Sequence, residues 1–85
     1  MMHEARSISL SALQEFRFEL DKGEAVTVRL LSGTAEVFGL ELALNVDYPF
    51  GDEARVAIFS WRGCELEISR LLCALGLEKN MARLL

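Results

Sequence analysis

Hydrophobic and polar residues alternate along this chain from residue 6 to residue 68, and this pattern constrains the fold more than any other feature. Phe16, Phe18 and Leu20, for example, are separated by the charged residues Arg17 and Glu19. A period of two places the apolar side chains of a strand on one face and the polar side chains on the other. The alternation recurs in residues 26–30, 35–38, 41–44, 46–48, 56–61 and 64–68. We therefore predict short antiparallel strands, each with one buried and one solvated face.

Turn-forming residues separate these alternating runs. Asp21-Lys22-Gly23-Glu24 is a turn signal in which Gly23 is free to adopt a positive φ angle. Further reversals are predicted at Ser32-Gly33, Gly39, Asn45, Gly51-Asp52 and Arg62-Gly63. Reversals spaced by about 8–12 residues or fewer favour a compact sandwich or barrel. Pro49 cannot donate a ladder hydrogen bond, so we expect it on an edge strand or at a bulge.

The alternation ends after Ser69, and we divide the chain there into a β domain over residues 6–69 and a tail over residues 70–85. The apolar residues of the tail are Leu71, Leu72, Leu75, Met81, Leu84 and Leu85. Their spacing fits a helix with Ser69 as its N-cap, although Gly76 would weaken that helix by about 1 kcal/mol. A tail that docks loosely or frays is equally compatible with the sequence.

Charge and cysteine content restrict the function classes. The formal net charge of −4 argues against broad, non-specific binding to nucleic acid or to an anionic membrane. No apolar run approaches the roughly 20 residues that span a bilayer, and the first residues lack the apolar core of a signal peptide. We expect an intracellular protein with Cys64 and Cys73 as free thiols, Cys64 being a small buried hydrophobe and not a nucleophile. His3 is expected in a frayed terminus, so it completes neither a metal site nor a Cys-His pair.

Three stretches occur in a fixed order: Phe-Arg-Phe-Glu at 16–19, Leu-Leu-Ser-Gly-Thr-Ala-Glu-Val-Phe-Gly-Leu-Glu-Leu at 30–42, and Val-Ala-Ile-Phe-Ser-Trp-Arg-Gly-Cys at 56–64. Together they resemble the N-terminal domain of the eukaryotic polyribonucleotide 5′-hydroxyl kinase family, a subunit of the pre-mRNA cleavage factor. The middle stretch is the most specific, and the resemblance covers residues 6–69. It implies a small antiparallel β-sandwich that precedes a P-loop kinase domain and packs beside it.

The resemblance also implies a nucleotide-binding role. In the family this domain helps to enclose the adenine end of ATP, and the two contacting positions fall here on Glu15 and Arg55. A carboxylate can accept a hydrogen bond from the adenine amino group while a cation lies near the ring or ribose. The family often has lysine at the second position, so at Arg55 a planar guanidinium replaces the compact ammonium group of lysine. Without the resemblance, both residues would be interpreted as ordinary solvated charges. For Glu36 two interpretations are open. It lies on the solvated face of its strand, or it braces the neighbouring loop by accepting hydrogen bonds from backbone N–H groups.

The sequence G-x-x-x-x-G-K-[ST] does not occur in these 85 residues. Without it there is no cradle for the β- and γ-phosphates and no hydroxyl for Mg²⁺, so we expect no catalysis by this chain alone. The Mg²⁺ would be held by the kinase domain. The tail over residues 70–85 also departs from the short β segment expected there, which suggests a truncated product or gene model.

The resemblance implies nuclear partners for this chain. These are the P-loop kinase domain of the same family and other subunits of the pre-mRNA cleavage complex. The implied role lies in 3′-end cleavage and polyadenylation, and in RNA or tRNA processing. We expect neither direct nucleic-acid binding by this domain nor membrane association. The alternative is a free-standing β-sandwich that binds protein partners and has no nucleotide role.

Overall fold

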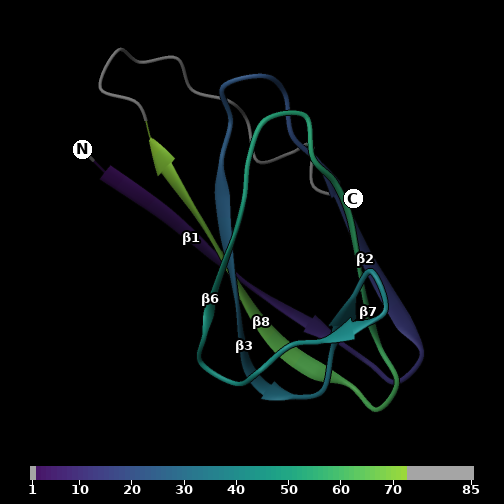
Figure 1. Cartoon of the computed structure of the whole chain (residues 1–85). Coiled ribbons are helices and arrows are strands. Elements are labelled where there is room, and N and C mark those ends of the chain that lie inside the picture. The colour runs from purple at the N-terminus through teal and green to yellow at the C-terminus, as the bar shows by residue number, and fades with distance from the viewer. Residues whose placement is uncertain (1, 73–85) are drawn as a thin grey trace.

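The structure is a computed structural model that describes residues 2–72, and these residues form two four-stranded antiparallel sheets (Figure 1). The strands are β1 (Met2–Leu10), β2 (Gln14–Glu19), β3 (Val26–Gly33), β4 (Glu36–Val37), β5 (Leu40–Glu41), β6 (Asp47–Phe50), β7 (Arg55–Ser60) and β8 (Cys64–Leu72). No helix occurs between residues 2 and 72. The predicted all-β sandwich is therefore confirmed.

The two sheets draw on strands that are distant in sequence. One sheet has the order β1-β8-β3-β6 and the other the order β2-β7-β4-β5. The long strands β1 and β8 run side by side across one layer, whereas β2 and β7 lie together in the other (Figure 1). Consecutive strands such as β1 and β2 therefore lie in different sheets, and the hydrophobic core forms between the two layers.

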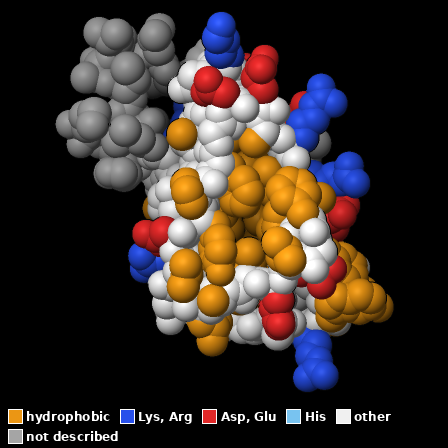
Figure 2. Space-filling view, in the orientation of Figure 1, with side chains coloured by type: hydrophobic (Ala, Val, Ile, Leu, Met, Phe, Trp, Pro, Cys, Tyr) orange, Lys and Arg blue, Asp and Glu red, His pale blue; other side chains and the backbone are white. Residues whose placement is uncertain are grey.

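The core confirms the period of two. Phe16 and Phe18 of β2 are buried, whereas their neighbours on that strand are exposed. The largest fully buried side chains are Phe18, Leu30, Ile58, Leu66, Ile68, Val28 and Ser60. Hydrophobic side chains gather in the seam between the two sheets, and Lys and Arg side chains project from the periphery (Figure 2). Full burial of one such aliphatic or aromatic side chain stabilises the fold by about 1.5–3 kcal/mol.

The predicted turn residues lie where the chain reverses. Gly23 has a φ of 84° between β2 and β3, and Gly39 has a φ of 77° between β4 and β5. Pro49 lies in β6, which is the edge strand of its sheet, as its missing N–H requires. Cys64 is buried among core residues, in agreement with its prediction as a small hydrophobe.

Both ends of the described chain differ from the prediction. β1 begins at Met2, so His3 lies in a strand and the prediction of a frayed terminus is wrong. Because β1 includes residues 2–5, it is long enough to pair with β8 as far as Leu72. Ser69 pairs within this ladder with Ala5 and Thr27, so its predicted role as a helix N-cap is also wrong. The rest of the predicted tail, residues 73–85 with Cys73, lies outside the described residues.

The alternation in fact persists beyond the predicted boundary. Leu66, Ile68 and Arg70 occupy successive inward positions of β8, and all three are buried. The sequence pattern breaks at this point because the inward residue is a charged arginine instead of an apolar residue. Because of this one charged residue at an inward position, the sequence pattern placed the end of the strand too early.

Candidate functional site

The outer face of the β2-β7-β4-β5 sheet carries the residues that the sequence selected. Glu15, Arg17 and Glu19 alternate along β2 with the buried Phe16 and Phe18, so all three point away from the core. The tight burial of the two phenylalanines fixes the register of the strand, because a shift by one residue would expose them. The packing of the core thus determines which charges face solvent here.

Glu15 is held in place by its neighbour on the same face. Arg17 Nε donates a hydrogen bond of 2.7 Å to Glu15 Oε1. The side chain of Glu15 is nevertheless 41% exposed. Glu15 Oε2 therefore remains available to accept a hydrogen bond from an amino group.

Arg55 is the first residue of β7 and lies directly opposite Glu19 of β2. The Arg55 Nε and Glu19 Oε1 atoms are 3.7 Å apart, and the arginine side chain is 84% exposed. An ion pair this exposed stabilises the fold by less than about 1 kcal/mol. Because the pair is weak and the side chain is exposed, the guanidinium is accessible to a ligand. Next to it lies a surface cavity of about 330 Å³, lined by Arg17, Phe18, Glu19, Phe38, Arg55, Val56 and Ala57.

The structure places Glu15 and Arg55 on the same face but does not bring them into contact. Glu15 lies opposite Phe59, at the end of β7, whereas Arg55 lies opposite Glu19, at the end of β2. Four strand positions between these rows correspond to about 13 Å. One ligand can contact both residues only if it extends along the strands, with Glu15 at one end and Arg55 at the other.

A second row of side chains crosses the same face at the level of Glu15. Glu15, Phe59, Glu36 and Glu41 lie opposite one another on the four strands β2, β7, β4 and β5. Glu36 Oε2 accepts a hydrogen bond of 3.3 Å from Trp61 Nε1. Glu36 is half-buried on the outward face of β4, in agreement with the first interpretation, a position on the outer face of a strand. Among residues 2–72 Glu36 accepts a side-chain N–H and no backbone N–H.

Three residues on this face were missed in the sequence. Trp61 follows the buried residues Ile58 and Ser60 at the next outward position, so the alternation itself could have identified it. Arg17 could have been found from its position two residues after Glu15. Phe38 likewise follows the buried residues Ala35 and Val37 at the next outward position, and it is exposed in a turn with a φ of 53°.

The outer face of the other sheet differs in its electrostatics. Arg29 Nε donates a hydrogen bond of 2.7 Å to Asp47 Oδ1. This hydrogen bond raises the pKa of Arg29 and lowers the pKa of Asp47. Glu67, which lies opposite Arg29 in the ladder, adds a smaller Coulombic contribution that also raises the pKa of Arg29. The acidic residues of that row thus have a cation between them.

Neither a metal-binding cluster nor a membrane-spanning helix occurs in the described part of the chain. Residues 2–72 contain no cluster of three or more His, Cys, Asp or Glu side chains that could hold a metal ion. Within the same range, no helix is long and apolar enough to cross a membrane.

The two packed antiparallel sheets define the chain as a small β-sandwich domain. The model of the N-terminal beta-sandwich domain of polyadenylation factor matches residues 9–84, so the chain belongs to this family. The match extends beyond residue 69, where the sequence analysis placed the end of the domain. The predicted resemblance is therefore confirmed at the level of the family.

Relatives from several organisms share this domain. The mRNA cleavage and polyadenylation factor CLP1 of Laccaria bicolor is 44% identical over 66 residues, which are 78% of this chain and 14% of that protein. The polyribonucleotide 5′-hydroxyl-kinase Clp1 of Danio rerio is 49% identical over 55 residues, or 65% of this chain and 12% of the relative. The chain thus spans about one seventh or less of the length of these relatives.

Solved structures show the same fold. A structure of the extended interface between Pcf11p and Clp1p has a TM-score of 0.78 and 20% identity, covering 96% of this chain and 18% of the other. A wild-type Clp1p–Pcf11p complex has a TM-score of 0.73 and 23% identity, covering 85% and 17%. A de novo designed double-stranded beta-helix also reaches a TM-score of 0.66, so the fold alone does not specify the function.

Proposed function

We propose that the outer face of β2 and β7 forms the adenine side of an ATP site, with Glu15 and Arg55 as the contacting residues. The observation that carries this proposal is their placement on one solvated face, about 13 Å apart, which is the arrangement that an extended ligand requires. Glu15 accepts from the adenine amino group through Oε2. Arg55 lies at the other end with a guanidinium that is 84% exposed.

The parent protein supplies the rest of the site in this proposal. A P-loop kinase domain of the same family covers the nucleotide from the opposite side and holds its phosphates and Mg²⁺. Because such a site is two-sided, we expect this chain alone to bind ATP weakly and to transfer no phosphate. One solved structure of a relative concerns the structural basis for ATP loss in a point mutant of Clp1p, so that relative is linked to ATP.

The biological role follows from the family. We propose that the domain acts in a nuclear RNA 5′-hydroxyl kinase-like subunit of the pre-mRNA 3′-end cleavage and polyadenylation machinery, and in RNA or tRNA processing. Other subunits of this machinery are the proposed partners, since two solved relatives were determined as complexes of Clp1p with Pcf11p. Contact with nucleic acid through this domain and association with membranes are not part of the proposal.

A second candidate is a protein-interaction module without a nucleotide role. The β4–β5 hairpin favours it, because Phe38 and Leu40 are each 73% exposed there. Exposed large hydrophobic side chains that lie close together are typical of surfaces that bind other proteins.

The two candidates are separated by complementation in trans. The Danio rerio Clp1 lacking its N-terminal domain is mixed with this chain, and ATP binding is measured by equilibrium dialysis. We expect the chain to restore binding, and Glu15→Ala or Arg55→Ala to abolish the recovery. Arg55→Lys should retain most of it, since lysine keeps the charge. Glu4→Ala, on the exposed part of β1, is the matched control and should recover binding fully. Failure of folded wild-type chain to restore ATP binding would favour the interaction module.

A further inference from the structure

A second cavity lies on the β4–β5 side of the same sheet and plays no part in the proposed adenine contacts. Its volume is about 790 Å³. Its lining residues are Thr34, Ala35, Glu36, Gly39, Glu41, Trp61 and Arg62. Two acidic side chains and one exposed indole thus converge on one hollow at the edge of the sheet.

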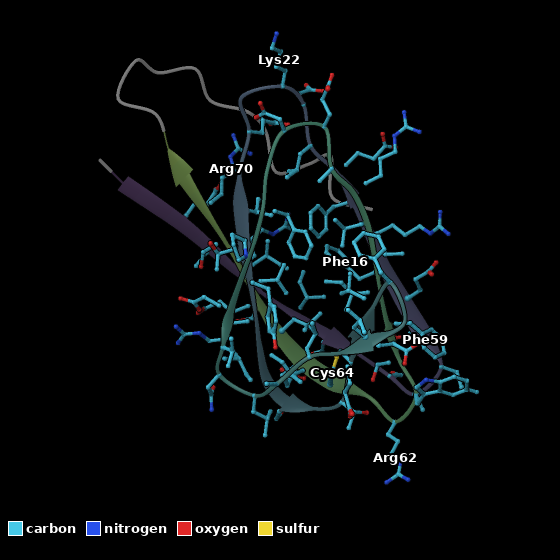
Figure 3. The ribbon with its side chains drawn as sticks, viewed as in Figure 1. Phe16, Lys22, Phe59, Arg62, Cys64 and Arg70 are labelled. Carbon is cyan, nitrogen blue, oxygen red and sulfur yellow. The ribbon has the colours of Figure 1, made fainter. Side chains whose placement is uncertain are left out.

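The two acidic residues form an unusual cross-strand pair. Glu36 of β4 lies directly opposite Glu41 of β5 in the ladder. Like charges directly opposite each other destabilise a strand pair. Within residues 2–72 neither carboxylate forms a salt bridge. Arg62 lines the same cavity, but its side chain extends away from the molecule (Figure 3). The negative charge of this pair is therefore left without a cation from the described chain.

A row of charged residues on the other sheet is arranged differently. On that sheet Arg29 lies between Asp47 and Glu67 and offsets both acidic charges. Glu36 and Glu41 are direct neighbours in their row, and the residue on the other side of Glu36 is Phe59, so within residues 2–72 no basic residue stands beside either carboxylate in the ladder. The cavity is thus complementary to a positive charge that comes from outside the described residues.

Trp61 supplies the second element of the cavity. Its ring contacts Phe59 edge to face at a centroid distance of 4.9 Å, and its Nε1 donates to Glu36. These two contacts fix the indole beside the carboxylates, yet Trp61 remains 60% exposed. A fixed and exposed indole is the best aromatic surface in proteins for a cation.

We propose that this cavity binds an arginine side chain presented by a protein partner. A guanidinium can stack on the indole of Trp61 while its planar fork donates to the carboxylates of Glu36 and Glu41. A lysine ammonium would satisfy the charge but would not stack. This site goes beyond the adenine contacts, since Glu36 is separated from Glu15 by two strand spacings, or about 10 Å.

The test uses the full 85-residue chain and the tripeptide acetyl-Gly-Arg-Gly-amide. Trp61 is the only tryptophan in the chain, so its fluorescence and its indole N–H signal report on this cavity alone. We expect a saturable change in both signals. We expect binding at least fivefold weaker for Glu36→Gln/Glu41→Gln, and for the neutral peptide acetyl-Gly-citrulline-Gly-amide. The double variant Glu4→Gln/Glu53→Gln removes the same charge away from the cavity and should bind as the wild type does.

Several outcomes would overturn the proposal. The first is the absence of a saturable change at peptide concentrations up to about 20 mM. The second is equal binding of the arginine and citrulline peptides, because charge would then play no part. Equal binding by the Glu36/Glu41 double variant is the third. Glu41→Gln alone provides a variant that keeps the Trp61–Glu36 hydrogen bond, so a loss of folding in the double variant does not remove the test. Addition of ATP should leave the peptide affinity unchanged, whether or not the proposed adenine site exists.

Discussion

Gly33 and Gly63 approach each other so closely that a Cβ atom added to Gly33 would lie 2.2 Å from the carbonyl oxygen of Gly63. The φ of Gly33 is also 79°, in the left-handed region. Gly33→Ala therefore combines backbone strain with a clash against backbone, and we expect a loss of at least about 2 kcal/mol in the free energy of unfolding. Thermal unfolding should show this as a decrease in Tm of about 10 °C for a domain of this size.

Gly23 is the matched control for this substitution. Its φ is 84°, but apart from Gly23 itself and its two chain neighbours no residue has an atom within 4 Å of a Cβ placed on it. Gly23→Ala therefore measures the backbone strain alone, which we expect to cost about 1 kcal/mol. Equal losses for the two variants would show that the close approach of Gly33 to Gly63 adds nothing.

Ser60 connects the same region to the core, and its replacement should be costly. Ser60 is fully buried, its Oγ donates to the Thr34 carbonyl at 2.6 Å, and it accepts from the Gly63 N–H at 2.8 Å. Ser60→Ala leaves both backbone groups without this partner, so we expect a loss of about 1–3 kcal/mol in urea unfolding. Ser7→Ala, on an exposed part of β1, should change stability by less than about 0.5 kcal/mol.

The stability of the fold should decrease in alkaline solution because of Cys64. Burial raises the pKa of the Cys64 thiol, the hydroxyl of Ser60 opposes this only in part, and the charge of Glu65 adds a smaller increase. The folded state thus holds the proton more tightly than the unfolded state, whose thiol has a pKa of about 8.5. This contribution is fully present below pH ~8.5 and is lost as the pH rises through the higher pKa of the folded state.

The measurement is urea unfolding between pH 7 and 10 in a Cys73→Ser background, compared with the same background carrying Cys64→Ala. We expect the stability of the first protein to decrease more steeply above pH ~8.5. Parallel pH profiles of the two proteins would contradict the assignment to Cys64.

The sequence predicted the strands wherever the burial alternates and the inward residues are apolar. Phe16 and Phe18 identify β2, and Val56 and Ile58 identify β7, because their side chains fill the core. The prediction ended β8 too early at Ser69, since Arg70 occupies an inward position. Alternation depends on polarity alone, so it cannot detect a strand that buries a charged residue.

The candidate site was predicted only in part for a related reason. Glu15 and Arg55 came from a resemblance, and their common face follows from the period of two. Their separation of four positions depends on the register between β2 and β7, which no local pattern encodes. The pairing of Glu36 with Glu41 likewise depends on the tight turn at Phe38 and Gly39.

Phe38 adopts a backbone conformation that is unfavourable for its residue type. It is followed by Gly39 in a two-residue turn, and both residues have positive φ angles, as type I′ turns require. Asparagine is preferred at this first position, and bulky residues are strained there. We expect Phe38→Asn to raise the free energy of unfolding by about 1 kcal/mol.

The same variant also tests whether Phe38 was retained for binding. Phe38 is 73% exposed and lines the cavity beside Arg55, so its loss should weaken any ligand held there. Thermal unfolding and the complementation assay for ATP binding should therefore change in opposite directions. A stability equal to that of the wild type would show that the turn stores no strain.

The like charges of Glu36 and Glu41 allow a test within the fold itself. Glu41→Lys would place a cation directly opposite Glu36 and convert a repulsive pair into an attractive one. Cross-strand charge pairs contribute about 0.2–1 kcal/mol, so we expect a gain of this size in the free energy of unfolding at low salt. The gain should diminish as salt is added, because the pair is accessible to solvent. Glu53→Lys, in the loop before β7, controls for the change in net charge and should show less of the gain.

The lysine introduced by Glu41→Lys would also occupy the position proposed for the arginine of a partner. Glu41→Lys should therefore lose the fluorescence response to acetyl-Gly-Arg-Gly-amide while it becomes more stable, and an unaltered response would contradict the proposed site.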